Sequence, residues 1–210
     1  DITIDATGRL TPYILLPPDP KLLHDNATNV VANKKGPWRP GQHTISWFAA
    51  NSLNSNLAST DQVFNVRPII SFEADRVVAE DSAVTVKLSL NGVAASYPVV
   101  VNYSVSGNAD SSDHDAVAGN VEISDGNKSA EISFNVLADS ISDPDESIIL
   151  SIDSVTHAVI GSKGQHRLTI SEGNSAPNVV IQFKQNGVVV SSGFIGDGEV
   201  SVSALVSDIN

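Results

Sequence analysis

The chain has 210 residues, 41% of them hydrophobic, with no Cys, no Met and a formal net charge of −12. The missing Cys excludes a disulfide framework and thiolate metal sites, and the excess of acids opposes binding to nucleic acids or to anionic membranes. No apolar run reaches the roughly 18 residues of a transmembrane helix. The N-terminus lacks the features of a signal peptide, and we expect the sequence to be part of a longer protein.

The negative charge is concentrated in the middle of the chain. Residues 1–68 carry five acids and six bases, residues 69–173 carry sixteen acids and five bases, and residues 174–210 carry three acids and one base. The middle segment therefore has a net charge of −11. Such a surface suits either a cation-binding module or a plain acidic surface that favours solubility.

The first segment, residues 1–67, has the features of a small β unit. The alternation in 44–49 predicts a strand, 62–66 predicts a closing strand, and the Pro-rich stretch 16–20 predicts a loop or an edge. Trp38 and Trp47 flank a Pro-Gly turn, and we expect them to pack in the core. About 65 residues make a small sandwich, so we expect this segment to be the C-terminal part of an immunoglobulin-like domain.

The middle segment, residues 68–173, predicts a complete β-sandwich. Residues at every second position are apolar, and turn signals such as Asn91-Gly92 and Asp125-Gly126 recur between the runs. Seven short strands over about a hundred residues are typical of an immunoglobulin-like sandwich. The predicted strands are 69–74, 83–90, 98–105, 120–124, 129–137, 147–152 and 165–170.

The last segment, residues 174–210, predicts strands at 179–183 and 199–206 with an Asn186-Gly187 turn after the first. Thirty-seven residues cannot close a core alone, so we expect the opening strands of a third sandwich. The fold class predicted for the whole chain is all-β, with tandem immunoglobulin-like antiparallel β-sandwiches.

Carboxylates cluster after three strands of the middle segment. The clusters are Glu80-Asp81, Asp110 with Asp113 and Asp115, and the acidic run 139–146. If these strand ends meet at one end of the sandwich, the carboxylates repel one another unless a cation lies between them. Oxygen ligands without Cys favour Ca²⁺ over zinc or copper. The competing interpretation is a solvated acidic loop, because Asp-Pro-Asp is also ordinary turn chemistry.

The same segment resembles a Calx-beta domain. The resemblance is carried by Val77-Val-Ala-Glu80-Asp81, by the tyrosine strand and acidic loop of 101–115, by the hairpin of 121–136, and by the acidic loop 139–146 before Ile148-Ile-Leu-Ser-Ile152. It implies Ca²⁺ binding by strand-end acids at one pole of the sandwich. The metal ligands that it implies here are Glu80, Asp113, Asp115, Asp139, Asp143 and Glu146.

This sequence departs from the calcium-dense members of that family. Ala138-Asp139-Ser140 has a single Asp where those members have consecutive ones, and Ser171-Glu172-Gly173 lacks the usual closing acidic pair. Because affinity follows the number of charged ligands, we expect one calcium site rather than four.

The flanking segments carry weaker resemblances. Residues 1–67 resemble a hyalin-repeat or related immunoglobulin-like domain through 2–8, 40–47 and 64–66, which implies adhesion or spacing. Residues 204–210 resemble the opening of a PKD-like or cadherin-like domain. Together these likenesses predict a secreted or cell-surface bacterial protein whose partners are calcium and other cell-surface proteins or glycans, with no nucleic acid and no membrane insertion.

Two other functions compete with a calcium module. One is a metal-free structural spacer. The other is an accessory carbohydrate-binding module of a polysaccharide hydrolase, which requires an exposed Trp38 as a stacking platform. An enzyme is not expected, because the sequence has no Gly-x-Ser-x-Gly, His-Glu-x-x-His or Walker motif. The five His show no metal-site spacing, and His166 alternates with Leu168 and Ile170 as a core residue would.

Overall fold

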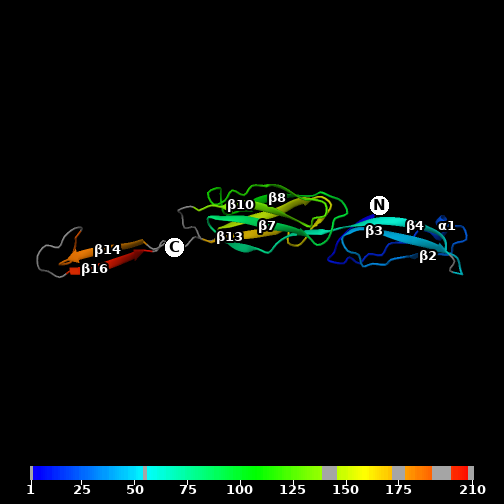
Figure 1. Cartoon of the computed structure of the whole chain (residues 1–210), viewed down its shortest axis with the longest axis horizontal. Helices are drawn as coiled ribbons and strands as arrows, with labels where there is room; N and C mark the ends of the chain where they lie inside the picture. The colour runs from blue at the N-terminus through cyan, green and yellow to red at the C-terminus, as the bar shows by residue number, and fades with distance from the viewer. Residues whose placement is uncertain (1, 54–55, 139–145, 172–177, 191–199, 208–210) are drawn as a thin grey trace.

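The computed structural model describes residues 2–53, 56–138, 146–171, 178–190 and 200–207 (Figure 1). Nearly every regular element among them is a strand, and the one helix is α1, Pro20–Leu23. The all-β fold class is confirmed. In the described part of the chain, no helix is long and apolar enough to cross a membrane.

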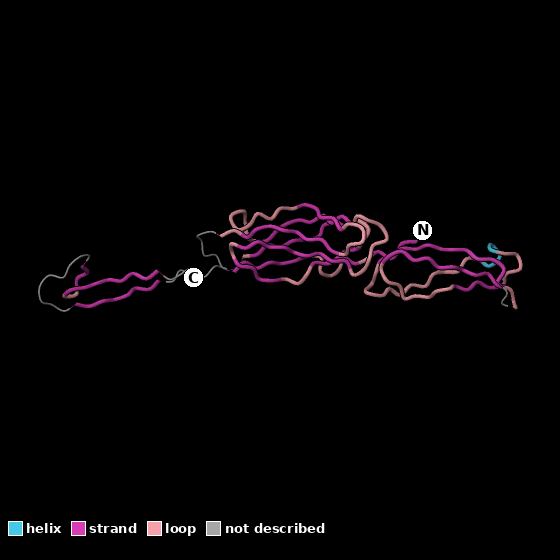
Figure 2. Tube along the Cα trace, viewed as in Figure 1, coloured by secondary structure: helices cyan, strands magenta, loops and turns pink. Residues whose placement is uncertain are grey.

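The N-terminal segment forms one four-stranded sheet in the order β1-β4-β3-β2. Loops run along one side of this sheet (Figure 2), and they bury Leu15 and Trp38 against it. The predicted strands 44–49 and 62–66 lie within β3 and β4. The strand bounds are β1 Ile2–Asp5, β2 Asn29–Ala32, β3 Gly41–Ala50 and β4 Asn56–Arg67.

Both tryptophans belong to the core of this sheet, as expected. Trp38 and Trp47 are each 6% exposed. The Nε1–H of Trp38 donates to the carbonyl of Tyr13 at 3.0 Å, and that of Trp47 donates to Gln62 Oε1 at 2.9 Å. Phe64 meets the Trp38 ring edge-on, with 4.8 Å between ring centroids. A stacking platform for sugars, which needs Trp38 exposed, is therefore absent at this residue.

The central segment is a sandwich of two sheets. One has the order β10-β7-β5-β12 and the other the order β6-β13-β11-β8-β9. All seven predicted strands are present, and two short strands, β6 and β12, accompany them. The bounds are β5 Ile69–Phe72, β6 Arg76–Ala79, β7 Ser82–Leu90, β8 Val99–Gly107, β9 Gly119–Ile123, β10 Ser129–Val136, β11 Ser147–Val155, β12 Val159–Ile160 and β13 Gln165–Ser171.

The core of the sandwich follows from the period-two pattern. In β7, Val84, Val86, Leu88 and Leu90 are buried while the residues between them face solvent, as expected when one face of a sheet packs on a core. β11 supplies the opposing layer through Ile148, Leu150 and Ile152. Burial of these side chains contributes about 1.5–3 kcal/mol each.

Three edge strands pair in parallel with their neighbours, whereas the other strand pairs are antiparallel as predicted. β1 pairs with β4, β12 with β5, and β6 with β13, all in parallel. These edge strands are joined to their neighbours by crossovers rather than hairpins, and a crossover returns the chain in the same direction. Residues 73–75 form a crossover between the two sheets, because β5 lies in one sheet and β6 in the other.

Charged groups surround a buried histidine at this crossover. The Asp75 carboxylate accepts hydrogen bonds from the Arg167 amide at 2.7 Å and from Lys163 Nζ at 2.6 Å, and these bonds lower its pKa. His166 is fully buried, and its Nδ1 lies 3.3 Å from the Glu73 carbonyl. Its Nε2 has no partner among the residues described. Burial lowers the pKa of His166, because desolvation disfavours the charged ring.

The N-terminal sheet and the central sandwich lie end to end (Figure 1). Only Pro68 separates β4 from β5, and Ile69 packs against the N-terminal core. The Oδ1 atom of Asn91 accepts a hydrogen bond from the Ile69 amide at 2.8 Å. The Nδ2 atom of the same side chain donates a hydrogen bond to the Gly8 carbonyl at 2.8 Å. A Cβ on Gly41 would lie 2.9 Å from Val93. Side chains therefore fix this junction directly.

The C-terminal segment forms a three-stranded sheet, β15-β14-β16. β14 is Asn178–Gln185, β15 is Val188–Val190 and β16 is Val200–Ser207. Asn186 and Gly187 both have positive φ, 50° and 82°, which matches the tight hairpin that Asn-Gly predicts. Ile181, Phe183 and Leu205 are exposed, so the described part of this sheet has apolar side chains that no second sheet covers.

We predict that Asn91→Ala loosens the junction. The substitution removes both side-chain bonds, which are worth about 1–2 kcal/mol together, so the Ile69 amide should exchange with solvent faster. Hydrogen exchange followed by mass spectrometry or NMR measures this rate. Asn127→Ala, in the exposed turn before β10, is the matched control and should leave Ile69 unchanged. Equal protection of Ile69 in both variants would contradict the account of the junction.

We also predict that His166 makes the sandwich acid-sensitive. Because its native pKa lies below the ordinary value of 6.5, the unfolded chain takes up a proton at higher pH than the native chain does. The stability is therefore retained above pH 6.5 and falls as the pH drops below it. The charged groups that face the ring and modulate this effect are Glu73, Asp75 and Arg76, with Lys163 and Arg167 beside Asp75.

Urea unfolding between about pH 7 and about pH 5 measures this slope. His166→Leu should flatten the dependence of stability on pH, whereas His157→Asn, at an exposed position with positive φ, should preserve it. A His166→Leu protein with the original slope would refute the assignment to His166.

Candidate functional site

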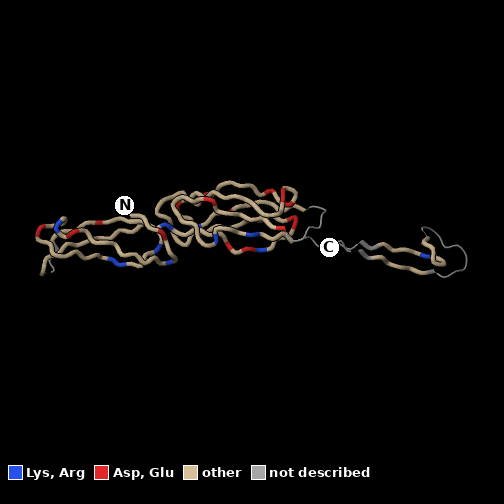
Figure 3. The backbone as a smooth tube through the Cα atoms, turned by 180° about the vertical axis from the view of Figure 1, so that it is seen from behind, with Lys and Arg blue, Asp and Glu red and all other residues tan. Residues whose placement is uncertain are grey.

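Strand direction brings the predicted acidic clusters to one end of the central sandwich. β6, β8, β10 and β13 end there, and β7 and β11 begin there. We call this end the acidic pole; its described acids are Glu80, Asp81, Asp110, Asp113, Asp115 and Glu146. Figure 3 shows acidic residues at this end, far from the N-terminal sheet. The turn between β9 and β10 at the opposite end contains Asp125 together with Lys128.

Loop 108–118 of the acidic pole is held by its own carboxylates. Asp113 is only 7% exposed, and its Oδ2 accepts the Asp110 amide at 2.6 Å. The Asp113 carbonyl accepts the Leu137 amide at 2.7 Å, which ties the loop to the end of β10. Asp110 Oδ1 accepts the amide and the hydroxyl of Ser112, and these bonds lower the Asp110 pKa.

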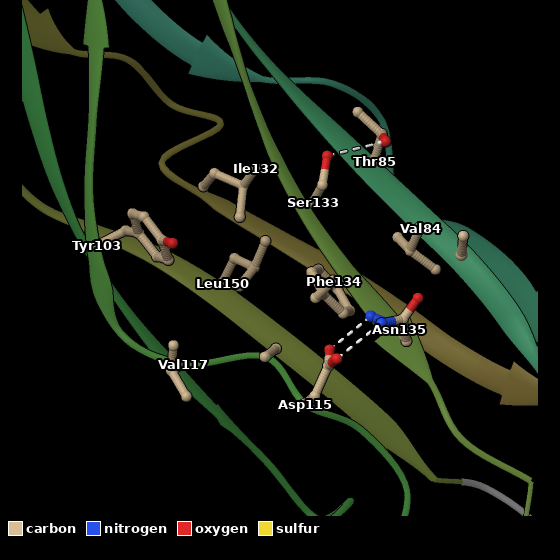
Figure 4. Close-up of a pocket in the computed structure, with 12 residues that line it drawn as sticks. Val84, Thr85, Tyr103, Asp115, Val117, Ile132, Ser133, Phe134, Asn135 and Leu150 are labelled. Atoms are coloured by element: carbon tan, nitrogen blue, oxygen red, sulfur yellow. Dashed lines mark hydrogen bonds between the residues drawn. The ribbon is translucent and has the colours of Figure 1, made fainter.

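Asp115 is clamped to Asn135 of β10 (Figure 4). Its Oδ1 accepts the Asn135 amide at 2.5 Å, and its Oδ2 accepts the Asn135 side-chain Nδ2–H at 2.7 Å. The Asp115 amide in turn donates to the Asn135 carbonyl at 3.1 Å. Hydrogen bonds to the charged form favour it, so the backbone and side chain of Asn135 lower the pKa of Asp115.

Glu80 and Glu146 lie on either side of the end of β13. The Glu80 amide donates to the Ser171 carbonyl at 3.3 Å, and the Glu146 carbonyl accepts the Ile170 amide at 2.9 Å. Both residues therefore have fixed backbone positions at the acidic pole. Two other predicted ligands, Asp139 and Asp143, lie outside the described residues.

The residues described at the pole do not by themselves complete a metal site. Among them, no group of three or more His, Cys, Asp or Glu side chains is arranged to hold a metal ion. The geometry accounts for this result in part, because Asp110, Asp113 and Asp115 already accept hydrogen bonds from their own loop and from β10. A calcium site here needs further oxygen ligands, and residues 139–145 are the nearest source in the sequence.

Three residues shape the pole through contacts that the sequence did not predict, although two of them belong to a turn that it does predict, Ser106-Gly107-Asn108. Asn108 Oδ1 accepts the Ser147 hydroxyl at 2.8 Å, and Asn135 clamps Asp115. Gly107 has φ of +134°, and a Cβ there would lie 2.0 Å from the Ser147 carbonyl oxygen, so only glycine fits. The usable signal was the Ser106-Gly107-Asn108 turn; the Asn135 contact spans twenty residues and leaves no local pattern.

A shallow pocket of about 320 Å³ opens beside the clamp (Figure 4). Phe134, Ile132 and Leu150 form its apolar part. Thr85 and Ser133, whose hydroxyl oxygens lie 3.1 Å apart, and the Asp115–Asn135 pair form its polar part. The pocket lies beside β10, where the edges of the two sheets meet.

Comparison with solved structures finds several Calx domains. The apo-form Calx CBD1 domain matches with a TM-score of 0.46 and 16% identity, over 51% of this chain and 98% of that domain. The calcium binding domain CBD12 of CALX1.1 matches with a TM-score of 0.48 and 12% identity, over 67% of this chain and 71% of that one. Calx CBD2 matches with a TM-score of 0.45 and 15% identity, over 50% of this chain and 86% of that domain.

No protein-family model matches the chain, and no curated protein matches its sequence. Structural likeness at this level assigns no role to individual residues.

We predict that Asn135→Ala raises the pKa of Asp115 toward its ordinary value. The variant removes the side-chain bond to Oδ2 and keeps the backbone bond to Oδ1, so the pKa should rise without reaching that value. A carbonyl-carbon NMR titration of the Asp115 carboxyl measures the change. Asn120→Ala, on the exposed face of β9, serves as the control. An Asp115 titration that is identical in the two variants would rule out the clamp.

Proposed function

We propose that this chain is a structural and adhesive stretch of a large extracellular bacterial protein, built from consecutive β modules with boundaries near 1–67, 68–173 and 174–210. In this proposal Ca²⁺ binds at the acidic pole of the central sandwich and orders its loops. The charge supports this role, since residues 69–173 carry sixteen acids against five bases. The Calx-beta-like order of motifs from 77 to 152 supports it as well.

The observation that carries the proposal is where the acidic run 139–146 is anchored. Before it, Leu137 donates to the carbonyl of Asp113; after it, the Ser147 carbonyl accepts the amides of Asn108 and Ala109 at 3.2 and 3.3 Å. The run therefore leaves and re-enters the described structure beside loop 108–118. A buried carboxylate, Asp113, lies at the same place.

The proposed ligands are Asp139, Asp143 and Glu146 together with Asp113 and Glu80. Ca²⁺ takes six to eight oxygen ligands in flexible geometry, so carbonyls and water would complete the shell. Asp115 was also predicted as a ligand. Both of its carboxylate oxygens already accept hydrogen bonds from Asn135. Asp115 would therefore coordinate Ca²⁺ only through the remaining lone pairs of these oxygens. Bound Ca²⁺ would supply the positive charge that relieves repulsion among these acids.

A second function, a spacer without metal, is favoured by one specific observation. The carboxylates of Asp110, Asp113 and Asp115 are satisfied within loop 108–118 and by β10, so this loop closes without a cation. The two proposals share the fold and differ only in the response to calcium. The third alternative, a carbohydrate-binding module, is disfavoured because its required platform, Trp38, is buried.

We predict that Ca²⁺ raises the melting temperature of the chain and that EDTA lowers it. Binding to the native state alone stabilises it by about 2.7 kcal/mol at a hundredfold excess of Ca²⁺ over Kd. Asp143→Ala should remove the difference between the two conditions. Asp125→Ala makes the same change at the opposite end of the sandwich and should retain it. If the unsubstituted chain melts identically in Ca²⁺ and in EDTA, the metal-free spacer is the better description.

A further inference from the structure

An apolar cleft lies in the N-terminal sheet, away from the acidic pole. It has a volume of about 640 Å³ and lies between segment 12–17, loop 34–38 and strands β2 and β3. Its floor consists of Ile45, Trp47 and Trp38, which are at most 6% exposed. Because both indole N–H groups already donate within the module, the floor offers apolar surface without an unsatisfied donor.

The cleft opens along an edge strand. β2 ends the sheet order β1-β4-β3-β2, so no described strand pairs with its outer side. Val30 and Ala32 of the inner face and Val31 of the outer face all line the cleft, which places its mouth along this edge. The Asn33 amide donates to the Ser46 carbonyl of β3. Since these groups alternate along a strand, the N–H and C=O groups of Val30 and Ala32 face away from β3.

Large apolar side chains are exposed around the mouth. Ile14 is 87% exposed and Val31 is 54% exposed. An exposed β edge with apolar neighbours is a template for another strand. An added strand would bond to the outward groups of β2 and insert alternate side chains into the cleft, as in recognition by β-augmentation.

The charge around the mouth of the cleft indicates the charge of the partner that would bind there. Lys34 and Lys35 are exposed and line the cleft, and no Asp or Glu is among the described residues that line it. The rest of the chain is acidic, with the net charge of −11 in residues 69–173. The cleft is therefore a basic site on an acidic protein, and it complements carboxylates on a partner strand.

We propose that the cleft along β2 binds an extended peptide segment of a partner protein in which apolar residues alternate with acidic ones. The segment adds a strand to β2, its apolar side chains enter the cleft and contact Ile14 and Val31 at its mouth, and its carboxylates pair with Lys34 and Lys35. This site is independent of calcium binding at the acidic pole.

The two tryptophans make the proposal directly measurable. They are the only Trp residues in the chain, and both line the cleft, so their fluorescence reports its occupancy. The probe is a capped seven-residue peptide of alternating Val and Glu, and its analogue of alternating Val and Lys is the peptide control. The Glu peptide should change the fluorescence saturably and bind at least about tenfold more tightly than the Lys peptide.

Two variants test the two halves of the recognition, its charge and its strand pairing. The double variant Lys34→Glu with Lys35→Glu should reverse the preference between the peptides, whereas Lys21→Glu with Lys128→Glu makes the same charge change outside the cleft and should preserve it. Ala32→Pro removes an outward-facing N–H without touching a bond to β3 and should weaken both peptides. Near-ultraviolet circular dichroism of each variant verifies that the module remains folded.

Three results would overturn the proposal. The first is Trp fluorescence that neither peptide changes. The second is equal affinity for the Glu and Lys peptides. The third is sedimentation of the chain as a dimer that Ala32→Pro dissociates, because the cleft would then be occupied by a second copy of this chain.

Discussion

Each long strand of the central sandwich runs from one end of the sandwich to the other, so successive turns alternate between the two ends. This constraint decides where the charge of the chain collects. The acids of 80–81, 108–118 and 146 fall on turns that share one end, although they are up to 66 residues apart in the sequence. The alternation of strand direction along the chain therefore places these acids at one end of the sandwich. Like charges at such short range are unfavourable, and the pole needs compensation.

The two ends of the sandwich are stabilised by different interactions. At the junction with the N-terminal sheet, apolar packing of Ile69 and the two bonds of Asn91 fix the neighbouring module without any ionised group. At the acidic pole, carboxylates hold loop 108–118 through bonds to amides. Such bonds disperse part of the negative charge of this loop. A cation at the pole and a preformed junction at the other end would together give a stiff series of modules.

The strands of the sandwich were predictable because their side chains obey a period of two. Val84, Val86, Leu88 and Leu90 identify β7 and its buried face without any other information. The tryptophan core was predictable for a similar reason, since Trp47 continues the alternation of Ile45. The short parallel edges β6 and β12 were not, because strands of four and two residues are too short to show a period.

The candidate site was predictable in position and only partly in detail. Strand-end acids indicated the pole, and Glu80, Asp113, Asp115 and Glu146 do lie there. The clamp of Asp115 by Asn135 depends on the register between a loop and a strand twenty residues later, which no local pattern records. The cleft along β2 was not predicted from the sequence, for the same reason. Its walls come from 12–17, from β2 and from β3, and only the folded chain brings these segments together.

Calcium binding at the acidic pole is the central claim, and isothermal titration of Ca²⁺ into chelator-stripped protein at physiological salt tests it most directly. The account predicts saturable binding of about one ion, abolished by Asp143→Ala and retained by Asp125→Ala. Absence of binding heat in the unsubstituted chain, together with an unchanged melting curve, would contradict it. The acidic pole would then be a solvated surface whose loop closes on its own hydrogen bonds, and the chain would be a metal-free spacer.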